Sequence, residues 1–249
     1  MNGSLFLRAG LLDGQTVLLE SCGTYPLQVA RPQRDMAGSL SLVVLLLSGG
    51  LLDGDCISMD IVVERGARLA VRTQAATQVH AGRSTQRLQV TVAEDGCFSY
   101  VPHAVVPHAR AVYHGQNGVV LAEGARALIA DVLSPGRVQF GECFAYQEVR
   151  LDLDARAGSR PLARERAVLR PDIALRGAQL GAFSHVAGAY MLGPGEAPHV
   201  AAGGPDVRIG ASELARGGWF VRALADRATT LDQLLAGLSA NWWAVVQSD

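Results

Sequence analysis

Polar and apolar side chains alternate one by one along several stretches of the chain. Residues 87–92 place Leu88, Val90 and Val92 between polar neighbours, and residues 148–154 repeat the pattern. Alternation with period two sends the two sets to opposite faces of a strand, which indicates half-buried β-strands. The turn-forming pairs between such stretches are Asp13-Gly14, Arg65-Gly66, Asp95-Gly96, Asn117-Gly118, Pro135-Gly136 and Gly203-Gly204. The pattern predicts a mainly β chain, but it does not choose between an antiparallel sandwich, a barrel and a β-solenoid.

The last twenty residues follow a helical period instead. The apolar residues that share one stripe at this spacing are Leu231, Leu234, Leu235, Leu238, Trp242 and Val245. Thr229 or Thr230 is a suitable N-cap for the predicted helix. The neighbours Trp242 and Trp243 project about 100° apart on a helix, so we expect one in the core and one partly exposed. The alternative is that this end, with Leu238, docks a partner, because Trp is enriched in interfaces.

Composition limits both compartment and chemistry. The 249 residues are 49% hydrophobic with a net charge of −1, which argues against non-specific nucleic-acid binding. All 22 basic residues are Arg, so the chain has neither the Lys of a phosphate-binding loop nor an amine for Schiff-base catalysis. The longest apolar run, near residues 40–47, is far shorter than the roughly 20 residues that span a membrane. No secretory leader is recognised at the N-terminus.

The four cysteines lie far apart, without a Cys-x-x-Cys pair. This spacing argues against a disulfide framework and against a structural zinc site. We therefore expect a reducing, cytoplasmic setting. The Gly- and Pro-rich segment 194–206 is expected to be a loop, and strand-like residues 218–225 are expected to return to the sheet. Residues 1–249 are thus predicted to form a single domain.

Residues 45–80 form the most distinctive block. An apolar run ends at Gly49-Gly50, and a turn with the acids Asp53 and Asp55 follows. Two strand-like pieces come next, and the block closes with the polar segment 73–77. Glycine permits the positive φ angles of a sharp turn, and Asp is tolerated there. The block predicts a strand, an acid-bearing loop and a hairpin.

Residues 48–55 (SGGLLDGD) and 73–80 (TQAATQVH) resemble the signature region of the urease accessory protein D family (UreD, also called UreH). The other blocks that resemble this family, in the same order, are residues 16–18, 26–29 and 31–32 near the start, then 100–103 with 107–109, 131–137 with 140–144, and 161–166. The resemblance extends over about residues 15–170. It implies a helical stack of β-strands, a β-solenoid-like scaffold with a few helices, rather than a sandwich.

The resemblance also implies a non-catalytic assembly factor for urease. Such a protein binds the helical accessory protein F, and this pair recruits the GTPase accessory protein G, which delivers nickel. The complex sits on apo-urease, and Ni²⁺ passes to the active site through an internal tunnel. The chain would hold no tight cofactor, only Ni²⁺ in transit, and GTP hydrolysis would belong to the partner. A homo-oligomer stays open.

Several acids stand at positions that match the family motifs. These acids are Asp55, Asp131, Glu142 and Glu165. Carboxylates are hard oxygen donors that suit transient contact with Ni²⁺ or an ion pair. Asp131 interrupts an apolar strand, where a carboxylate is costly unless paired, and Arg137 and Arg166 are its expected partners. The alternative, that the acids line a water-filled passage, requires weak sites that release the ion.

Two further patterns are weaker. Asp53 stands where the family usually has Gly, and ordinary turn hydrogen bonding accounts for it. His103 and His108 have a His-x4-His spacing, but Pro102 and Pro107 exclude a helix, and alternation sends the two rings to opposite sides of a strand. We do not expect them to bind one metal ion.

The alternative function is a stand-alone β-solenoid polysaccharide hydrolase. Its carboxylates would lie about 5–9.5 Å apart, and the available pairs are Asp53 with Asp55 and Asp152 with Asp154. The second pair alternates with leucines, as an ordinary solvated face does. The sequence contains neither His-Glu-x-x-His nor Gly-x-Ser-x-Gly, and nothing in it requires an enzyme.

Overall fold

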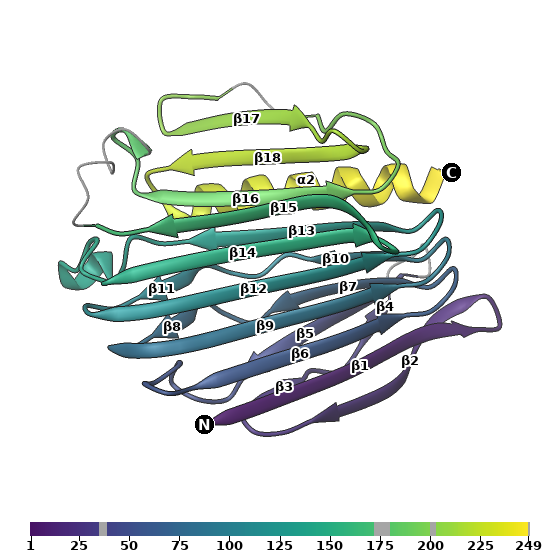
Figure 1. Ribbon diagram of the computed structural model, residues 1–249, viewed down its shortest axis with the longest axis horizontal. Coiled ribbons are helices and arrows are strands. Elements are labelled where there is room, and N and C mark those ends of the chain that lie inside the picture. The colour runs from purple at the N-terminus through teal and green to yellow at the C-terminus, as the bar shows by residue number, and fades with distance from the viewer. Residues whose placement is uncertain (35–38, 172–179, 200–202, 249) are drawn as a thin grey trace.

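Two β-sheets face each other in the computed structural model, which describes residues 1–34, 39–171, 180–199 and 203–248 (Figure 1). Sheet A contains, in spatial order, β15 (Arg160–Leu169), β14 (Glu148–Ala157), β12 (Ala111–Leu121), β9 (Gly82–Val92), β6 (Cys56–Val63), β1 (Asn2–Leu12) and β2 (Gln15–Gly23). Sheet B contains β17 (Val207–Glu213), β18 (Gly218–Ala225), β16 (His185–Leu192), β13 (Arg126–Leu133), β10 (Cys97–Tyr100), β7 (Arg68–Thr73), β5 (Leu40–Leu46) and β3 (Leu27–Val29). Paired beside that path are β4 (Gln33–Arg34), β8 (Thr77–Val79) and β11 (Val105–Pro107). The mainly β prediction is confirmed.

From β5 to β14 the chain passes repeatedly from one sheet to the other, and its successive strands stack in parallel. Leu69 pairs with Leu40, Phe98 with Leu69, and Ala127 with Phe98, so each step advances 29 residues. The step from β12 to β14 is longer, because a loop with the 3₁₀-helix η1 (Val138–Phe140) is inserted. Antiparallel neighbours flank this stack, with β2 beside β1, β15 beside β14, and β16, β18 and β17 beyond β13.

The turns between the sheets repeat with the same step. Gly66, Asp95 and Gly124 occupy equivalent turn positions with φ angles of 68°, 57° and 67°. A left-handed backbone favours Gly and tolerates Asp, which explains why these types recur. One turn prediction is wrong, because Asn117-Gly118 lies inside β12. A Cβ on Gly118 would lie 2.1 Å from Oε1 of the exposed Gln89 side chain on the next strand, which would have to move aside.

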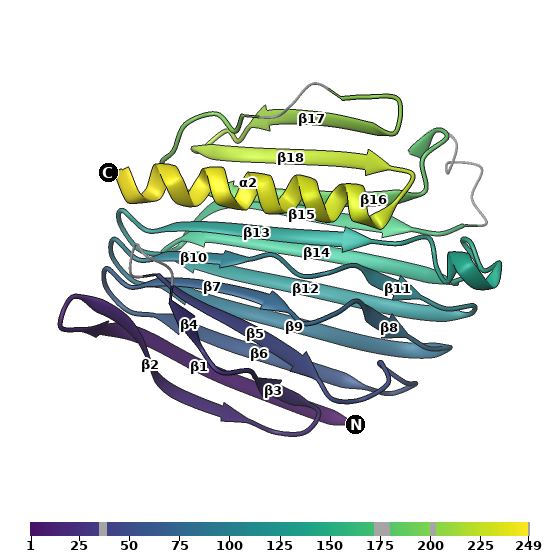
Figure 2. The same cartoon turned by 180° about the vertical axis from the view of Figure 1, so that it is seen from behind.

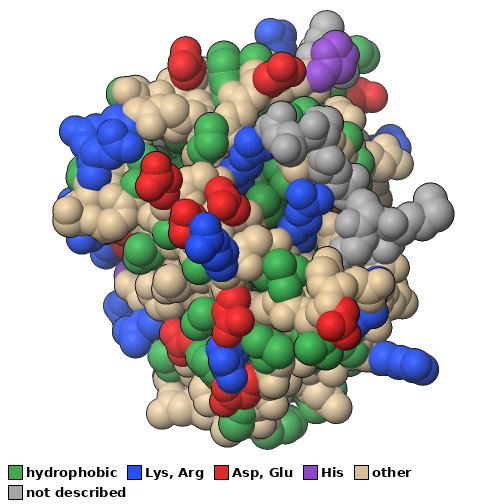
Figure 3. All heavy atoms as spheres, turned by 90° about the vertical axis from the view of Figure 1, so that its right-hand side faces the viewer, with side chains coloured by type: hydrophobic (Ala, Val, Ile, Leu, Met, Phe, Trp, Pro, Cys, Tyr) green, Lys and Arg blue, Asp and Glu red, His purple; other side chains and the backbone are tan. Residues whose placement is uncertain are grey.

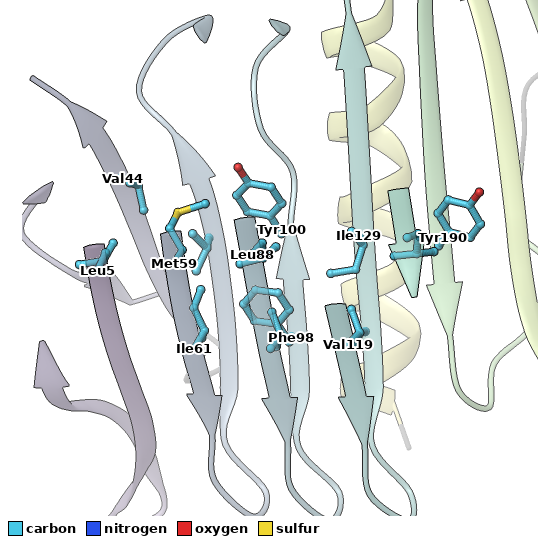
Figure 4. Packing of buried hydrophobic residues seen from close by; sticks show 14 of the residues in the cluster. Leu5, Val44, Met59, Ile61, Leu88, Phe98, Tyr100, Val119, Ile129 and Tyr190 are labelled. Atoms are coloured by element: carbon cyan, nitrogen blue, oxygen red, sulfur yellow. The ribbon is translucent and has the colours of Figure 1, made fainter. Parts of the chain in front are cut away.

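The main core fills the layer between the sheets. Leu5, Met59 and Leu88 of sheet A face Phe98 and Ile129 of sheet B (Figure 4). Alternation in each strand supplies this apolar layer, because every second side chain points to the opposite sheet.

A second apolar cluster lies on the outer face of sheet B, under helix α2 (Ala228–Ser248) (Figure 2). Leu231, Leu235 and Leu238 of the helix are at most 3% exposed and pack against strands β13, β16 and β18. Burial of each leucine is worth about 1.5–3 kcal/mol. The predicted C-terminal helix is confirmed. Within the described residues, no helix has the length and apolarity needed to cross a membrane.

Candidate functional site

A polar cluster interrupts the apolar layer between the sheets. Asn117 on β12 is only 9% exposed, and its Nδ2 donates to both carboxylate oxygens of Asp131 on β13, at 3.1 and 3.2 Å. The two side chains come from opposite sheets, so this contact crosses the core. Although Asp131 faces inward, it keeps some accessible surface. The strand pattern places a carboxylate where almost every neighbour is apolar.

Burial dominates the acidity of Asp131. It raises the pKa of the carboxyl from 3.8 to about 6, the Asn117 hydrogen bonds lower it, the charge of Glu165 raises it and Arg222 lowers it. A desolvated carboxylate loses the hydration that water provides, which explains the direction. Asp131 is therefore a carboxyl that exchanges its proton near neutral pH.

Glu165 and Arg222 form the second part of the cluster. They make a close ion pair that joins β15 of sheet A to β18 of sheet B. The Arg222 guanidinium also lies 4.9 Å from the centroid of the Phe220 ring, which stacks on Tyr190. Planar Arg side chains suit such combined stacking and carboxylate binding. The structure thus brings Asp131 and Glu165 into one electrostatic environment.

Polar groups continue the cluster along the layer. Gln86 donates from Nε2 to the hydroxyl of Tyr100 at 3.2 Å and accepts from the hydroxyl of Tyr113 at 3.3 Å. Burial raises the pKa of both tyrosines, and the charge of Asp131 adds to this effect. The tyrosines therefore stay neutral, and Gln86 satisfies their buried hydroxyls.

Gln86 also lines a cavity of about 350 Å³ at the edge of the layer. The residues around this cavity include the double glycine and the polar segment of the distinctive sequence block: Ser48, Gly49, Gly50, Thr73, Gln74, Ala75, Ala76, Thr77 and Gln78. Gln86 thus joins the cavity at the signature segments to the two core tyrosines.

Asp55 lies apart from this cluster. Its carboxylate accepts hydrogen bonds from the Met1 ammonium at 2.6 Å and from the Leu52 amide at 2.8 Å. Burial raises its pKa, but these two groups lower it, and the net direction is downward. Asp53 accepts from the backbone N–H of Arg83 on β9 at 2.7 Å, so its hydrogen bond joins two distant segments rather than staying within its own turn as expected. A nickel contact at Asp55 stays a prediction.

Glu142 is also separate, in the loop after η1. It pairs with Arg137, with Nε at 2.9 Å from Oε2, and accepts from the amide of Ala109. The Arg137 hydrogen bond is the main reason that the pKa of Glu142 is lowered. The expectation that Arg137 or Arg166 pairs with Asp131 is wrong, because Arg166 lies against Asp152 on sheet A, 3.4 Å away.

The expectation that one tryptophan of α2 lies in the core and the other is partly exposed is wrong, because both side chains have intermediate exposure. Trp243 donates from Nε1 to Oγ of Ser99 at 3.1 Å, while Trp242 packs against the cluster under the helix and meets Trp243 edge-on at 4.9 Å. Both are half-buried, and Leu238 is 3% exposed. A partner contact through these three residues stays a prediction, and the packing of Leu238 is already used inside the chain.

The second carboxylate pair of the hydrolase alternative, Asp152 with Asp154, does not supply a general acid. Asp152 is bound by Arg150 and His114, and Asp154 by Arg156 and Arg164. Hydrogen bonds from Arg156 above all lower the pKa of Asp154 to about 2, and the pKa of Asp152 is also lowered, against its burial. A glycosidase needs one carboxyl with a raised pKa to protonate the leaving group.

Comparison with known proteins identifies the family to which the chain belongs. A family model described as "UreD urease accessory protein" matches residues 1–247. The chain belongs to the UreD urease accessory protein family.

Two relatives align with nearly all of this UreD-family chain, and both are named "Urease accessory protein UreD". The protein from Opitutus terrae is 31% identical over 254 aligned positions, which cover 96% of this chain and 93% of the relative. The protein from Deinococcus radiodurans is 31% identical over 238 positions, covering 92% and 86%. A third, from Acetivibrio thermocellus, is 27% identical over 173 positions, covering 68% and 66%.

Sequence reasoning about this UreD-family chain missed Gln86, Asn117 and Arg222. Gln86 and Asn117 share the inward face of sheet A with apolar side chains, since Gln86 pairs with Ile57 and Asn117 with Leu88. A polar residue at an apolar position of a period-two strand was the available signal. Arg222 carried a similar signal inside the strand-like segment 218–225.

Proposed function

We propose that this chain is a non-catalytic scaffold that assists the insertion of nickel into urease in the cytoplasm. It would bind apo-urease together with the accessory proteins F and G, and protein G would hydrolyse GTP. Membership of the UreD family supports the urease connection. The absence of Lys from the sequence is consistent with GTP hydrolysis by the partner.

The observation that carries the proposal is the carboxylate cluster inside the apolar layer. Ni²⁺ as cargo would pass between the sheets, from the cavity at Gln86 toward Asp131 and Glu165. Oxygen donors bind nickel more weakly than a group of Cys or His ligands does, so an ion would be released again. Within the described chain, no group of three or more His, Cys, Asp and Glu residues is placed to hold a metal ion.

Co-expression with urease and its accessory proteins tests this proposal. The chain should co-purify with accessory protein F and apo-urease, and its omission should leave urease without nickel. Nickel content per urease active site, measured by mass spectrometry with and without GTP, gives the result. Full nickel loading of urease without this chain would contradict the proposal.

A further inference from the structure

His80 and His108 occupy equivalent positions in successive turns of the stack. They follow β8 and β11, which pair in parallel through Val79 and Pro107 among others. Their ring centroids lie 4.5 Å apart, and the ring planes meet at 66°. The sequence spacing drew attention to His103 with His108, but His103 is instead held by Thr73 through two contacts of 2.9 Å.

A hydrogen bond holds each ring at its Nε2. Nε2 of His80 lies 3.1 Å from the carbonyl oxygen of Gly49, and Nε2 of His108 lies 2.9 Å from Oε1 of Gln78. These oxygens only accept, so each Nε2 carries the proton and each Nδ1 keeps its lone pair. Neither Nδ1 has a hydrogen-bond partner among the described residues. Metal-binding imidazoles are typically held in this way by their second nitrogen.

The spacing of the rings suits a shared ion. A metal–nitrogen bond of about 2.0–2.1 Å puts a ring centroid about 3.2 Å from the ion, and two rings bound at about a right angle then have centroids about 4.5 Å apart. The observed separation of 4.5 Å is compatible with this right-angle arrangement. Imidazole nitrogen favours Ni²⁺, Cu²⁺ and Zn²⁺ over Mg²⁺ or Ca²⁺.

The surrounding charges leave the pair available to a cation. Arg137 and Glu142 are the charged side chains that act on His108. The guanidinium of Arg137 is itself paired with Glu142. Both rings are only half-buried, so an ion and its water ligands can reach them.

We propose that His80 and His108 form an exchangeable surface site for a divalent transition-metal cation, with Ni²⁺ as the cation tested here. Two protein donors leave the other coordination positions to water, which makes the site open. Gly49 and Gln78, which orient the two rings, also line the cavity that contains Gln86. Metal binding at His80 and His108 does not depend on the proposed function. Only a role of this site in passing nickel to the passage between the sheets would rest on that function.

Competition with a chromogenic Ni²⁺ indicator tests the site on the purified full chain at pH 7.5. His80→Ala and His108→Ala should each weaken the tightest Ni²⁺ site at least about tenfold, the range seen when even an outer-shell partner is lost. His199→Ala removes an exposed imidazole elsewhere and should change nothing. Equal affinity and stoichiometry in wild type, His80→Ala and His108→Ala would overturn the proposal.

A second measurement covers the case in which the variants do not fold. Ni²⁺ titrated into the wild-type chain should broaden the NMR signals of two of the six histidine rings before the others. Uniform broadening, or broadening that starts at other rings, would overturn the site. Urease is absent from both experiments, so their failure would leave the proposed function standing.

Discussion

Asn117 of sheet A donates from one amide nitrogen to both carboxylate oxygens of Asp131 of sheet B, at 3.1 and 3.2 Å. The two residues are close because the chain changes sheets between them at the turn with Gly124. The contact compensates only part of the cost of burying the carboxylate, since the pKa of Asp131 is still about 6. The interior therefore keeps a charge that costs stability at neutral pH.

Asp131→Asn should stabilise the chain at neutral pH. Its pKa is about 6 in the folded chain and 3.8 when unperturbed, so the folded state binds the proton more tightly. The free energy of unfolding should fall as pH rises from about 4 to about 6, by up to about 3 kcal/mol, and Asp131→Asn should abolish this fall. Urea unfolding of the wild type and of Asp131→Asn at pH 4 and 7.5 measures this change in the free energy of unfolding. An equal pH dependence in both proteins would contradict its assignment to Asp131.

Loss of one partner of the Glu165–Arg222 pair should cost about 1–3 kcal/mol. Both side chains are about one-third exposed, so water screens part of the loss. Glu165→Gln and Arg222→Met should show a coupling energy of about 0.5–2 kcal/mol in a double-mutant cycle by urea unfolding. The exposed pair Arg65–Glu94 is the matched control and should couple by less than about 0.5 kcal/mol. Equal coupling in both pairs would refute an inter-sheet role.

Gly124→Ala should destabilise the fold by at least about 1–2 kcal/mol. The position has φ +67°, and a Cβ there would lie 2.2 Å from Oδ1 of Asp95. Gly237→Ala is the contrasting variant, because Gly237 lies within α2 and a Cβ there meets no atom within 4 Å. That change should stabilise the chain by about 0.5–1 kcal/mol. Thermal unfolding compares the two; shifts of the same sign would contradict this account.

Removal of residues 229–249 should lower the Tm strongly rather than act only on partner binding. It exposes the apolar face of sheet B that Leu231, Leu235 and Leu238 cover. Ala240→Arg tests partner binding more cleanly, because Ala240 lies on the exposed face of α2. We predict weaker co-purification with accessory protein F at unchanged Tm. Undiminished co-purification would place that interface elsewhere.

The sequence predicted strands and the C-terminal helix because their periodicity is local. It did not reveal the 29-residue step, since equivalent turn positions hold different residues, such as Gly66 and Asp95. The pairing of Asp131 with Asn117 depends on that step and on the facing of two sheets. Asn117-Gly118 looked like a turn because local chemistry does not show that these residues pair with Leu88 and Gln89 of the neighbouring strand.

One end of the molecule shows how its charges are distributed. Acidic and basic side chains are interspersed on the end of the molecule seen in Figure 3, as expected for a net charge of −1. Non-specific nucleic-acid binding requires a cationic stripe, and the described residues on this end do not form one. By contrast, the core residue Asp131 and the partly exposed Glu165 could be selected by motif but not placed together without the fold.

The most direct test of nickel passage between the sheets is the nickel content of urease loaded with the help of the Asp131→Asn variant. In a reconstituted mixture with apo-urease and accessory proteins F and G, this variant should still co-purify, yet leave urease with several-fold less nickel than wild type. Asp154→Asn, on the outer face of sheet A, is the control and should load urease normally. Normal nickel loading by Asp131→Asn would contradict the passage of the ion between the sheets.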